Sequence, residues 1–107
     1  MKLLLIIISN EDANAVSKVL LKEKFFVTKL SSTGGLLRNG NTTLLVGTEN
    51  DQVTHVVNLV GEVAKPRKQS VSSIQPEEFS MYSSLPLEVS VGGATIFVLD
   101  VENFYKI

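Results

Sequence analysis

The sequence predicts an α+β fold, a ferredoxin-like βαββαβ sandwich with an extra C-terminal hairpin strand and two long loops. Apolar runs and alternating segments typical of strands are separated by two segments with the spacing of amphipathic helices. Their order along the chain is strand, helix, strand, strand, helix, strand, strand. An antiparallel sheet with both helices on one face is the simplest architecture that buries both apolar helix stripes.

Length, charge and cysteine content limit the classes of protein to consider. With 107 residues, 44% hydrophobic and 20% charged, the chain is expected to form one packed globular domain over residues 1–107. A net charge of -1 provides no positive field for nucleic acid or an anionic membrane, so neither is expected as a partner. The absence of cysteine excludes disulfides, thiol catalysis and thiolate metal sites, and it suits the cytoplasm.

The first strand is expected at residues 2–8, with a helix directly after it. The apolar run over residues 3–8 is too short for a signal peptide, which needs about seven to fifteen apolar residues before a cleavage site. Residues 9–12, Ser-Asn-Glu-Asp, provide a capping side chain and early carboxylates for a helix that runs to about Lys24. Ala13, Val16 and Leu20 share one apolar face of that helix.

Two further strands and a second helix follow. Strands are expected at residues 25–31 and 42–47, with a polar loop over residues 34–40 between them. Residues 48–51, Thr-Glu-Asn-Asp, predict a second helix cap. Apolar positions then recur at the spacing of a helix that buries one face: Val53, Val56, Val57, Val60 and Val63.

The C-terminal third is expected to combine one long loop with a hairpin. Residues 65–86 are rich in serine and lack periodicity, which predicts a loop throughout. Residues 87–91 alternate between apolar and polar side chains, Gly92-Gly93 has the length of a hairpin turn, and residues 94–99 return as a strand. No stretch approaches the roughly twenty apolar residues of a membrane span.

Residues suited to catalysis are few. His55 is the only histidine, and no cysteine, second histidine or nearby carboxylate is evident to orient it. The adjacent carboxylates at positions 11–12 and 77–78 are explained by helix capping and solvation. We therefore expect no catalytic residue, no metal site and no enzymatic activity.

Residues 28–43 concentrate hydroxyls, glycines, amides and two cations. Gly35 and Gly40 have the spacing of a P-loop, but Asn41 stands where the phosphate-binding lysine should be, and a strand follows instead of a helix. Exposed backbone N–H groups, threonine hydroxyls and an asparagine amide can still donate hydrogen bonds to a phosphate diester. Two interpretations stay open for this segment: a phosphate-binding loop, or a glycine-rich turn between strands.

Two longer motifs are specific enough to identify a family resemblance. The first comprises Thr-Lys-Leu at 28–30, Thr-Gly-Gly at 33–35, Leu-Arg at 37–38 and Gly-Asn-Thr-Thr at 40–43. The second comprises Val-Gly-Gly-Ala-Thr at 91–95 and Phe-Val-Leu at 97–99. Together they resemble the PII-like cyclic di-AMP receptor family of the PstA/DarA type, over nearly the whole chain and most weakly across residues 65–85.

The resemblance implies a non-enzymatic signal-transduction protein in the cytoplasm of a bacterium. It implies a PII-like homotrimer that binds cyclic di-AMP, with no further cofactor, in each cleft between subunits and acts on an unknown downstream protein. Phe97 is implied to close the cleft from the neighbouring subunit. The implied ligand-binding residues are Phe26, Thr28, Gly35, Leu36, Leu37, Asn41, Gly47 and Phe97.

Several residues depart from the family pattern. Phe26 replaces a usual polar or basic residue, Leu36 replaces the phenylalanine that stacks on a base, and Lys106 stands where the family has glutamine. An aromatic stack is worth about 1–3 kcal/mol per base, so the change at Leu36 weakens binding unless Phe26 supplies a substitute surface. An alternative therefore stays open: a PII-like trimer with lost or altered nucleotide binding that acts as a protein-interaction module.

Overall fold

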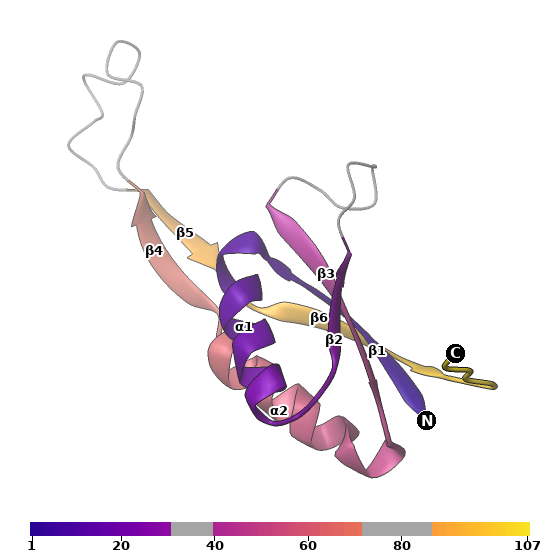
Figure 1. Cartoon of the computed structure of the whole chain (residues 1–107). Coiled ribbons are helices and arrows are strands. Elements are labelled where there is room, and N and C mark those ends of the chain that lie inside the picture. The colour runs from indigo at the N-terminus through magenta and orange to yellow at the C-terminus, as the bar shows by residue number, and fades with distance from the viewer. Residues whose placement is uncertain (31–39, 72–86) are drawn as a thin grey trace.

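The computed structural model describes residues 1–30, 40–71 and 87–107 (Figure 1). Two long helices and six strands are assigned within these ranges, together with one short 3-10 turn. They are β1 (Lys2–Ser9), α1 (Asn10–Lys22), β2 (Val27–Leu30), β3 (Asn41–Thr48), the 3-10 turn η1 (Asn50–Gln52), α2 (Val53–Val63), β4 (Arg67–Val71), β5 (Leu87–Val91) and β6 (Ala94–Asp100). Residues 31–39 and 72–86, which hold most of the two predicted loops at 34–40 and 65–86, lie outside the described residues.

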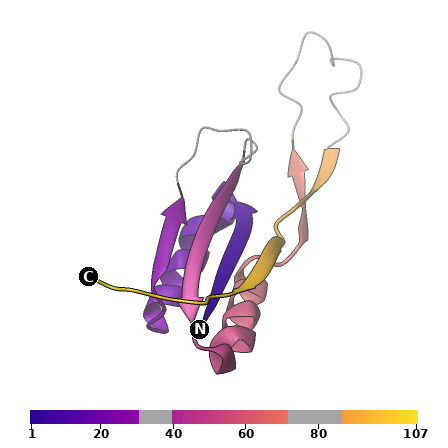
Figure 2. The ribbon, with the colours of Figure 1, turned by 90° about the vertical axis from the view of Figure 1, so that its right-hand side faces the viewer.

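The main sheet has the strand order β2-β3-β1-β6, and every neighbouring pair is antiparallel. Both helices lie on the same face of this sheet (Figure 2). The strand order and the single helical layer confirm the predicted α+β, ferredoxin-like sandwich.

The core lies between the sheet and the two helices. β1 alternates, so that Leu4, Ile6 and Ile8 are buried against the helices while the residues between them are only half-buried. Each fully buried side chain of this size stabilises the fold by about 1.5–3 kcal/mol relative to an exposed one. The other buried apolar residues are Ala13, Val16, Leu20, Leu44, Val46, Val56, Val60 and Ala64.

The two helices begin differently. The hydroxyl of Ser9 caps α1 by accepting a hydrogen bond from the Asp12 backbone N–H at 3.3 Å, as predicted. The predicted side-chain cap of α2 is wrong, because the chain enters α2 through η1 and neither Glu49 nor Gln52 makes a side-chain cap hydrogen bond. The predicted buried stripe of α2 is correct at Val56 and Val60, but Val57 is 38% exposed because it lies at the margin of the stripe.

A two-stranded antiparallel arm replaces part of the predicted loop. β4 lies inside residues 65–86 and pairs with β5, with Arg67 opposite Val91 and Val71 opposite Leu87. No strand was predicted here because Arg67, Lys68 and Gln69 are all exposed, so no alternation of apolar and polar residues marks the strand. The hydrogen bonds to β5, rather than side-chain burial, define β4. The arm extends away from the main sheet (Figure 1).

The Gly92-Gly93 pair is a corner between two sheets and not the predicted hairpin turn. β5 pairs with β4, whereas β6 pairs with β1, so the extra hairpin is β4–β5 and not a C-terminal one. Both glycines have positive φ, at 88° and 80°. A Cβ on Gly92 would collide with the Lys65 carbonyl oxygen and approach the Arg67 guanidinium to 2.7 Å, so only glycine fits. Sequence spacing alone does not distinguish such a corner from a turn.

Candidate functional site

The face of the main sheet opposite the helices, which we call the open face, carries one row of directly paired residues across all four strands. Thr28 on β2 pairs with Leu45 on β3, Leu45 with Leu5 on β1, and Leu5 with Phe97 on β6. Directly opposed residues of antiparallel strands point to the same side of a sheet. Since Val27 pairs with the buried Val46, Thr28 and its row face away from the helices.

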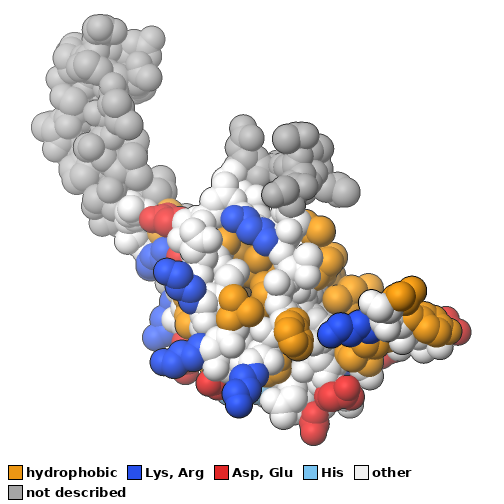
Figure 3. Space-filling model, viewed as in Figure 1, with side chains coloured by type: hydrophobic (Ala, Val, Ile, Leu, Met, Phe, Trp, Pro, Cys, Tyr) orange, Lys and Arg blue, Asp and Glu red, His pale blue; other side chains and the backbone are white. Residues whose placement is uncertain are grey.

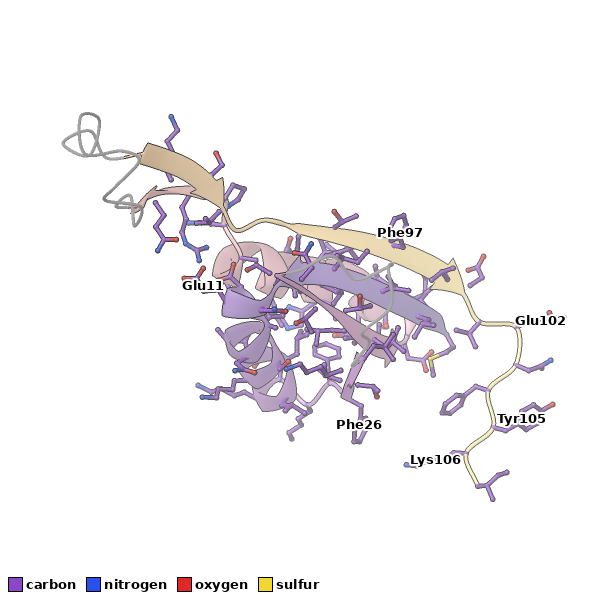
Figure 4. All side chains as sticks on the ribbon, turned by 90° about the horizontal axis from the view of Figure 1, so that it is seen from above. Glu11, Phe26, Phe97, Glu102, Tyr105 and Lys106 are labelled. Carbon is purple, nitrogen blue, oxygen red and sulfur yellow. The ribbon has the colours of Figure 1, made fainter. Side chains whose placement is uncertain are left out.

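Two predicted ligand-binding residues, Thr28 and Phe97, therefore lie at opposite edges of one surface. Three inter-strand steps of about 4.8 Å separate their backbones by about 14 Å. Phe97 is 52% exposed, and Figure 4 shows it at the opposite edge of the sheet from Phe26. One copy of the chain does not bring Thr28 and Phe97 into contact with the same small group.

Phe26 lies just before β2 and is 81% exposed, which is unusual for a phenylalanine. The extended residues 101–107 continue from β6 across the sheet (Figures 2 and 4) and bring Lys106 to this ring. The Nζ atom of Lys106 lies 5.8 Å from the ring centroid, within the range of a cation–π interaction. An accessible aromatic face and an ammonium group thus lie side by side, two residues from Thr28.

The remaining predicted residues divide into two groups. Asn41 and Gly47 are exposed on β3, where Asn41 pairs with Ser9 and Gly47 pairs with Leu3. A Cβ at Gly47 would make only an ordinary contact with the Met1 sulfur at 3.9 Å, so the fold of one chain does not require glycine there. The other group, Gly35, Leu36 and Leu37, lies outside the described residues.

A cavity of about 230 Å³ opens where β1 ends and where β3 and β6 begin. It places Asn41 next to the Gly92-Gly93 corner, which sequence reasoning had interpreted only as a turn. The glycine pair was the available signal, but its closeness to Asn41 depends on β6 returning beside β1. The cavity is lined by Ile7, Ile8, Ser9, Asn41, Gly92, Gly93, Ala94 and Thr95.

The first residues of α1 connect the strands around this cavity. The backbone N–H of Asn10 donates to the Gly40 carbonyl at 2.7 Å, and its side-chain oxygen accepts from the Thr42 hydroxyl. Asp12 is buried and receives two hydrogen bonds from Arg67 of β4, at 2.8 and 3.3 Å. Hydrogen bonding from the Arg67 guanidinium holds the pKa of the Asp12 carboxyl below its ordinary value.

His55 has a carboxylate partner that the sequence did not reveal. Its Nε2 lies 3.0 Å from Glu23 Oε1, and its ring packs at a tilt against Phe25 with centroids 5.9 Å apart. The expectation that no carboxylate orients His55 is therefore wrong, because the two helices bring Glu23 and His55 together across 32 positions of sequence. Both side chains are about half exposed.

The described residues contain no group of three or more side chains suited to hold a metal ion. Among the helices assigned in those residues, none has the length and apolar character needed to cross a membrane.

Comparison with known proteins agrees with the resemblance seen in the sequence. A family model described as "Cyclic-di-AMP receptor" matches residues 1–107. A crystal structure of a functionally unknown protein from Pediococcus pentosaceus is similar at 34% identity, with a TM-score of 0.75 over 99% of this chain and 96% of that one. The fold, the motifs and the match over every residue place this chain in the cyclic-di-AMP receptor family.

Proposed function

We propose that this protein is a non-enzymatic receptor that binds cyclic di-AMP in the clefts between the subunits of a homotrimer. The observation that carries the proposal is the placement of Thr28 and Phe97 on one row of the open face, at opposite edges of the sheet. A cleft that uses both residues needs Thr28 from one copy and Phe97 from the next. The same relation repeated in a ring gives a closed assembly with one site per interface.

The exposed apolar surface supports assembly. Leu3, Leu5 and Ile7 are only half-buried on the open face, and the tail adds Phe104 and Tyr105 at 66% and 82% exposure. Figure 3 shows hydrophobic side chains at the surface where this tail leaves the sheet. Contiguous apolar surface of this kind marks an interaction site in a globular protein. A copy of the same chain offers a matching surface.

The residue types around the cleft suit a cyclic dinucleotide. The Thr28 hydroxyl and the Asn41 amide can hydrogen-bond phosphate oxygens or base edges. Phe26 offers a face for an adenine in place of the ring missing at Leu36, and Lys106 places a positive charge beside it. Gly35, Leu37 and Gly47 complete the proposed set of ligand-binding residues.

A signalling role in the bacterial cytoplasm completes the proposal. A receptor needs a surface whose arrangement changes when the ligand binds. The β4–β5 arm extends away from the main sheet and is the proposed contact for a downstream protein. No catalytic group takes part, because binding alone is the signal.

Calorimetric titration tests the proposed function. Purified protein is titrated with cyclic di-AMP, ATP and cyclic di-GMP, and its mass is measured by light scattering in the same buffer. We expect saturable binding of cyclic di-AMP with one ligand per chain, and weaker or no binding of the other two nucleotides. Absence of cyclic di-AMP binding at high micromolar concentration would contradict the receptor function.

The departures at Phe26 and Leu36 favour a second candidate, a trimer that has lost the nucleotide and acts as a protein-interaction module. The variant Leu36→Phe separates the two, since it restores the stacking ring of the family. Tighter binding by this variant than by the wild type supports the receptor. If neither protein binds cyclic di-AMP while both remain trimeric, the interaction module takes its place.

A further inference from the structure

An ion pair joins the start of α1 to the base of the β4–β5 arm. Arg67 Nη2 donates to Asp12 Oδ1 at 2.8 Å and Nη1 to Asp12 Oδ2 at 3.3 Å, a two-point contact. The Asp12 side chain is 8% exposed and that of Arg67 is 41% exposed. We call this pair the Asp12–Arg67 clasp.

The clasp also reaches the glycine corner. Arg67 Nη1 donates a further hydrogen bond to the Lys65 carbonyl at 3.1 Å, and a Cβ built on Gly92 would lie 2.7 Å from the same nitrogen. The Gly93 N–H donates to the Ala64 carbonyl. The guanidinium is thus packed between α1, the segment that enters β4 and the segment that leaves β5.

The cavity described above adjoins this junction at Ser9 and at Gly92. Ser9 and Asn41 form one wall, and Ser9 caps the helix whose first turn holds Asp12. Gly92 and Gly93, which directly follow β5, lie on the other side, whereas Thr95 belongs to β6 and is held by pairing with Ile7 of β1. Moving the base of the arm therefore moves Gly92 and Gly93 relative to Ser9 and Asn41.

We infer that Asp12 and Arg67 are positioning residues, which fix the width of the cavity by fixing the direction of the β4–β5 arm. One part of the inference, that the cavity belongs to the ligand site, rests on the proposed function. A ligand that fills the space between Asn41 and the glycine corner favours the state in which Asp12 and Arg67 are paired. The β4–β5 arm then points in one defined direction. Differential contact of this kind is what couples a binding site to a distant element.

Distance measurement between two spin labels tests the positioning. The chain has no cysteine, so Lys18→Cys on α1 and Ser90→Cys on β5 introduce the only two thiols, both at exposed positions. Labelled chains are diluted with unlabelled ones to remove distances between copies. Asp12→Asn and Arg67→Gln are compared with Arg67→Lys, which keeps the charge but not the two-point fork.

A matched control removes an ion pair elsewhere. Asp100→Asn breaks the pair between Lys2 and Asp100, whose carboxylate is 85% exposed at the far end of β6. We expect a single narrow distance distribution in the wild type and in Asp100→Asn, a broad or shifted one in Asp12→Asn and Arg67→Gln, and an intermediate one in Arg67→Lys. Titration of cyclic di-AMP should show about three- to thirtyfold weaker binding in the two clasp variants.

The outcomes separate the inference from the proposed function. Unchanged distances in both Asp12→Asn and Arg67→Gln overturn the clasp, whether or not the wild type binds cyclic di-AMP. If the two clasp variants show broader distance distributions but bind cyclic di-AMP as tightly as the wild type, the proposed link between the clasp and the ligand site is overturned. If the two clasp variants show broader distance distributions but the wild type binds no cyclic di-AMP, the clasp is supported and the receptor function is overturned. Arg67 is partly exposed, so its variants are expected to fold even where Asp12→Asn does not.

Discussion

At the scale of single residues, Thr28 and Asn41 are the exposed polar side chains on which the proposed site depends. Replacing either by alanine removes a hydrogen bond to the ligand and leaves a polar group unpaired, at a cost of about 1–3 kcal/mol. We expect roughly ten- to a hundredfold weaker binding of cyclic di-AMP by calorimetry. Thr54→Ala, on the exposed side of α2, is the matched control and should leave the affinity unchanged. Equal losses in all three variants would contradict the assignment.

The aromatic ring of Phe26 is expected to supply base stacking that position 36 no longer provides. Phe26→Leu keeps an apolar side chain but removes the ring, and should weaken cyclic di-AMP binding by about 1–3 kcal/mol. Phe26→Tyr keeps the ring and should bind like the wild type. Because Phe26 is 81% exposed, neither change should alter the melting temperature without ligand. Wild-type affinity in Phe26→Leu would remove this residue from the site.

Asp12 makes stability depend on pH in a predictable direction. Its pKa is lowered from 3.8, first by hydrogen bonding from Arg67, so the ionised carboxylate favours the folded state. The contribution is fully present above the ordinary pKa of an aspartate and is lost as the pH falls through the lowered one. Thermal unfolding of Asp12→Asn should therefore occur at lower temperature than that of the wild type near pH 7.

The difference in melting temperature between the two proteins should disappear in acid, once the pH has fallen below the lowered pKa of Asp12 and the wild-type carboxyl is protonated as well. Asp100→Asn provides the comparison, since it removes an ion pair that is largely exposed and contributes little. If the melting temperatures of Asp12→Asn and the wild type differ by the same amount over the whole pH range, the charge of Asp12 does not contribute to stability.

At the scale of elements, glycine is required at the corner between β5 and β6 but not in the middle of α2. Gly92 has φ of 88° and no room for a Cβ, whereas Gly61 lies in α2 with nothing within 4 Å of a built Cβ. Gly61→Ala should stabilise the protein by up to about 1 kcal/mol, because alanine is the better helix former. Gly92→Ala should destabilise it and disturb the cavity wall. Chemical denaturation measures the free energy of unfolding of both variants. An equal change in Gly61→Ala and Gly92→Ala would contradict the difference between the two positions.

The elements themselves differ in how far their sequences predict them. β1 and α1 were predicted to within two residues, because Leu4, Ile6 and Ile8 alternate and Ala13, Val16 and Leu20 recur at helical spacing. These patterns report burial against a core. β4 was missed because its described side chains are exposed, so no burial pattern exists to be detected. The corner at Gly92-Gly93 was misinterpreted because a turn and a change of sheet use the same glycine conformations.

At the scale of the whole molecule, the apolar open face and the tail predict a trimer. Light scattering should give three times the chain mass of 11.7 kDa at micromolar concentration. Leu99→Glu places a charge on an open-face residue that is 44% exposed in one copy, so it should dissociate the assembly without unfolding the chain. Lys18→Glu, on the exposed side of α1, is the control for added negative charge. A monomeric wild type would remove the proposed cleft.

The sequence by itself determined the order of the elements from β1 to α2, the buried faces of β1 and α1, and the family, because each depends on local periodicity or on contiguous motifs. Tertiary structure decided what depends on distant segments meeting. The row from Thr28 to Phe97 exists only through the order of four strands. Asn41 meets Gly92, Asp12 meets Arg67, and Lys106 meets Phe26 across 51, 55 and 80 positions of sequence. No spacing rule along the chain encodes such contacts, since they follow from the path of the whole backbone.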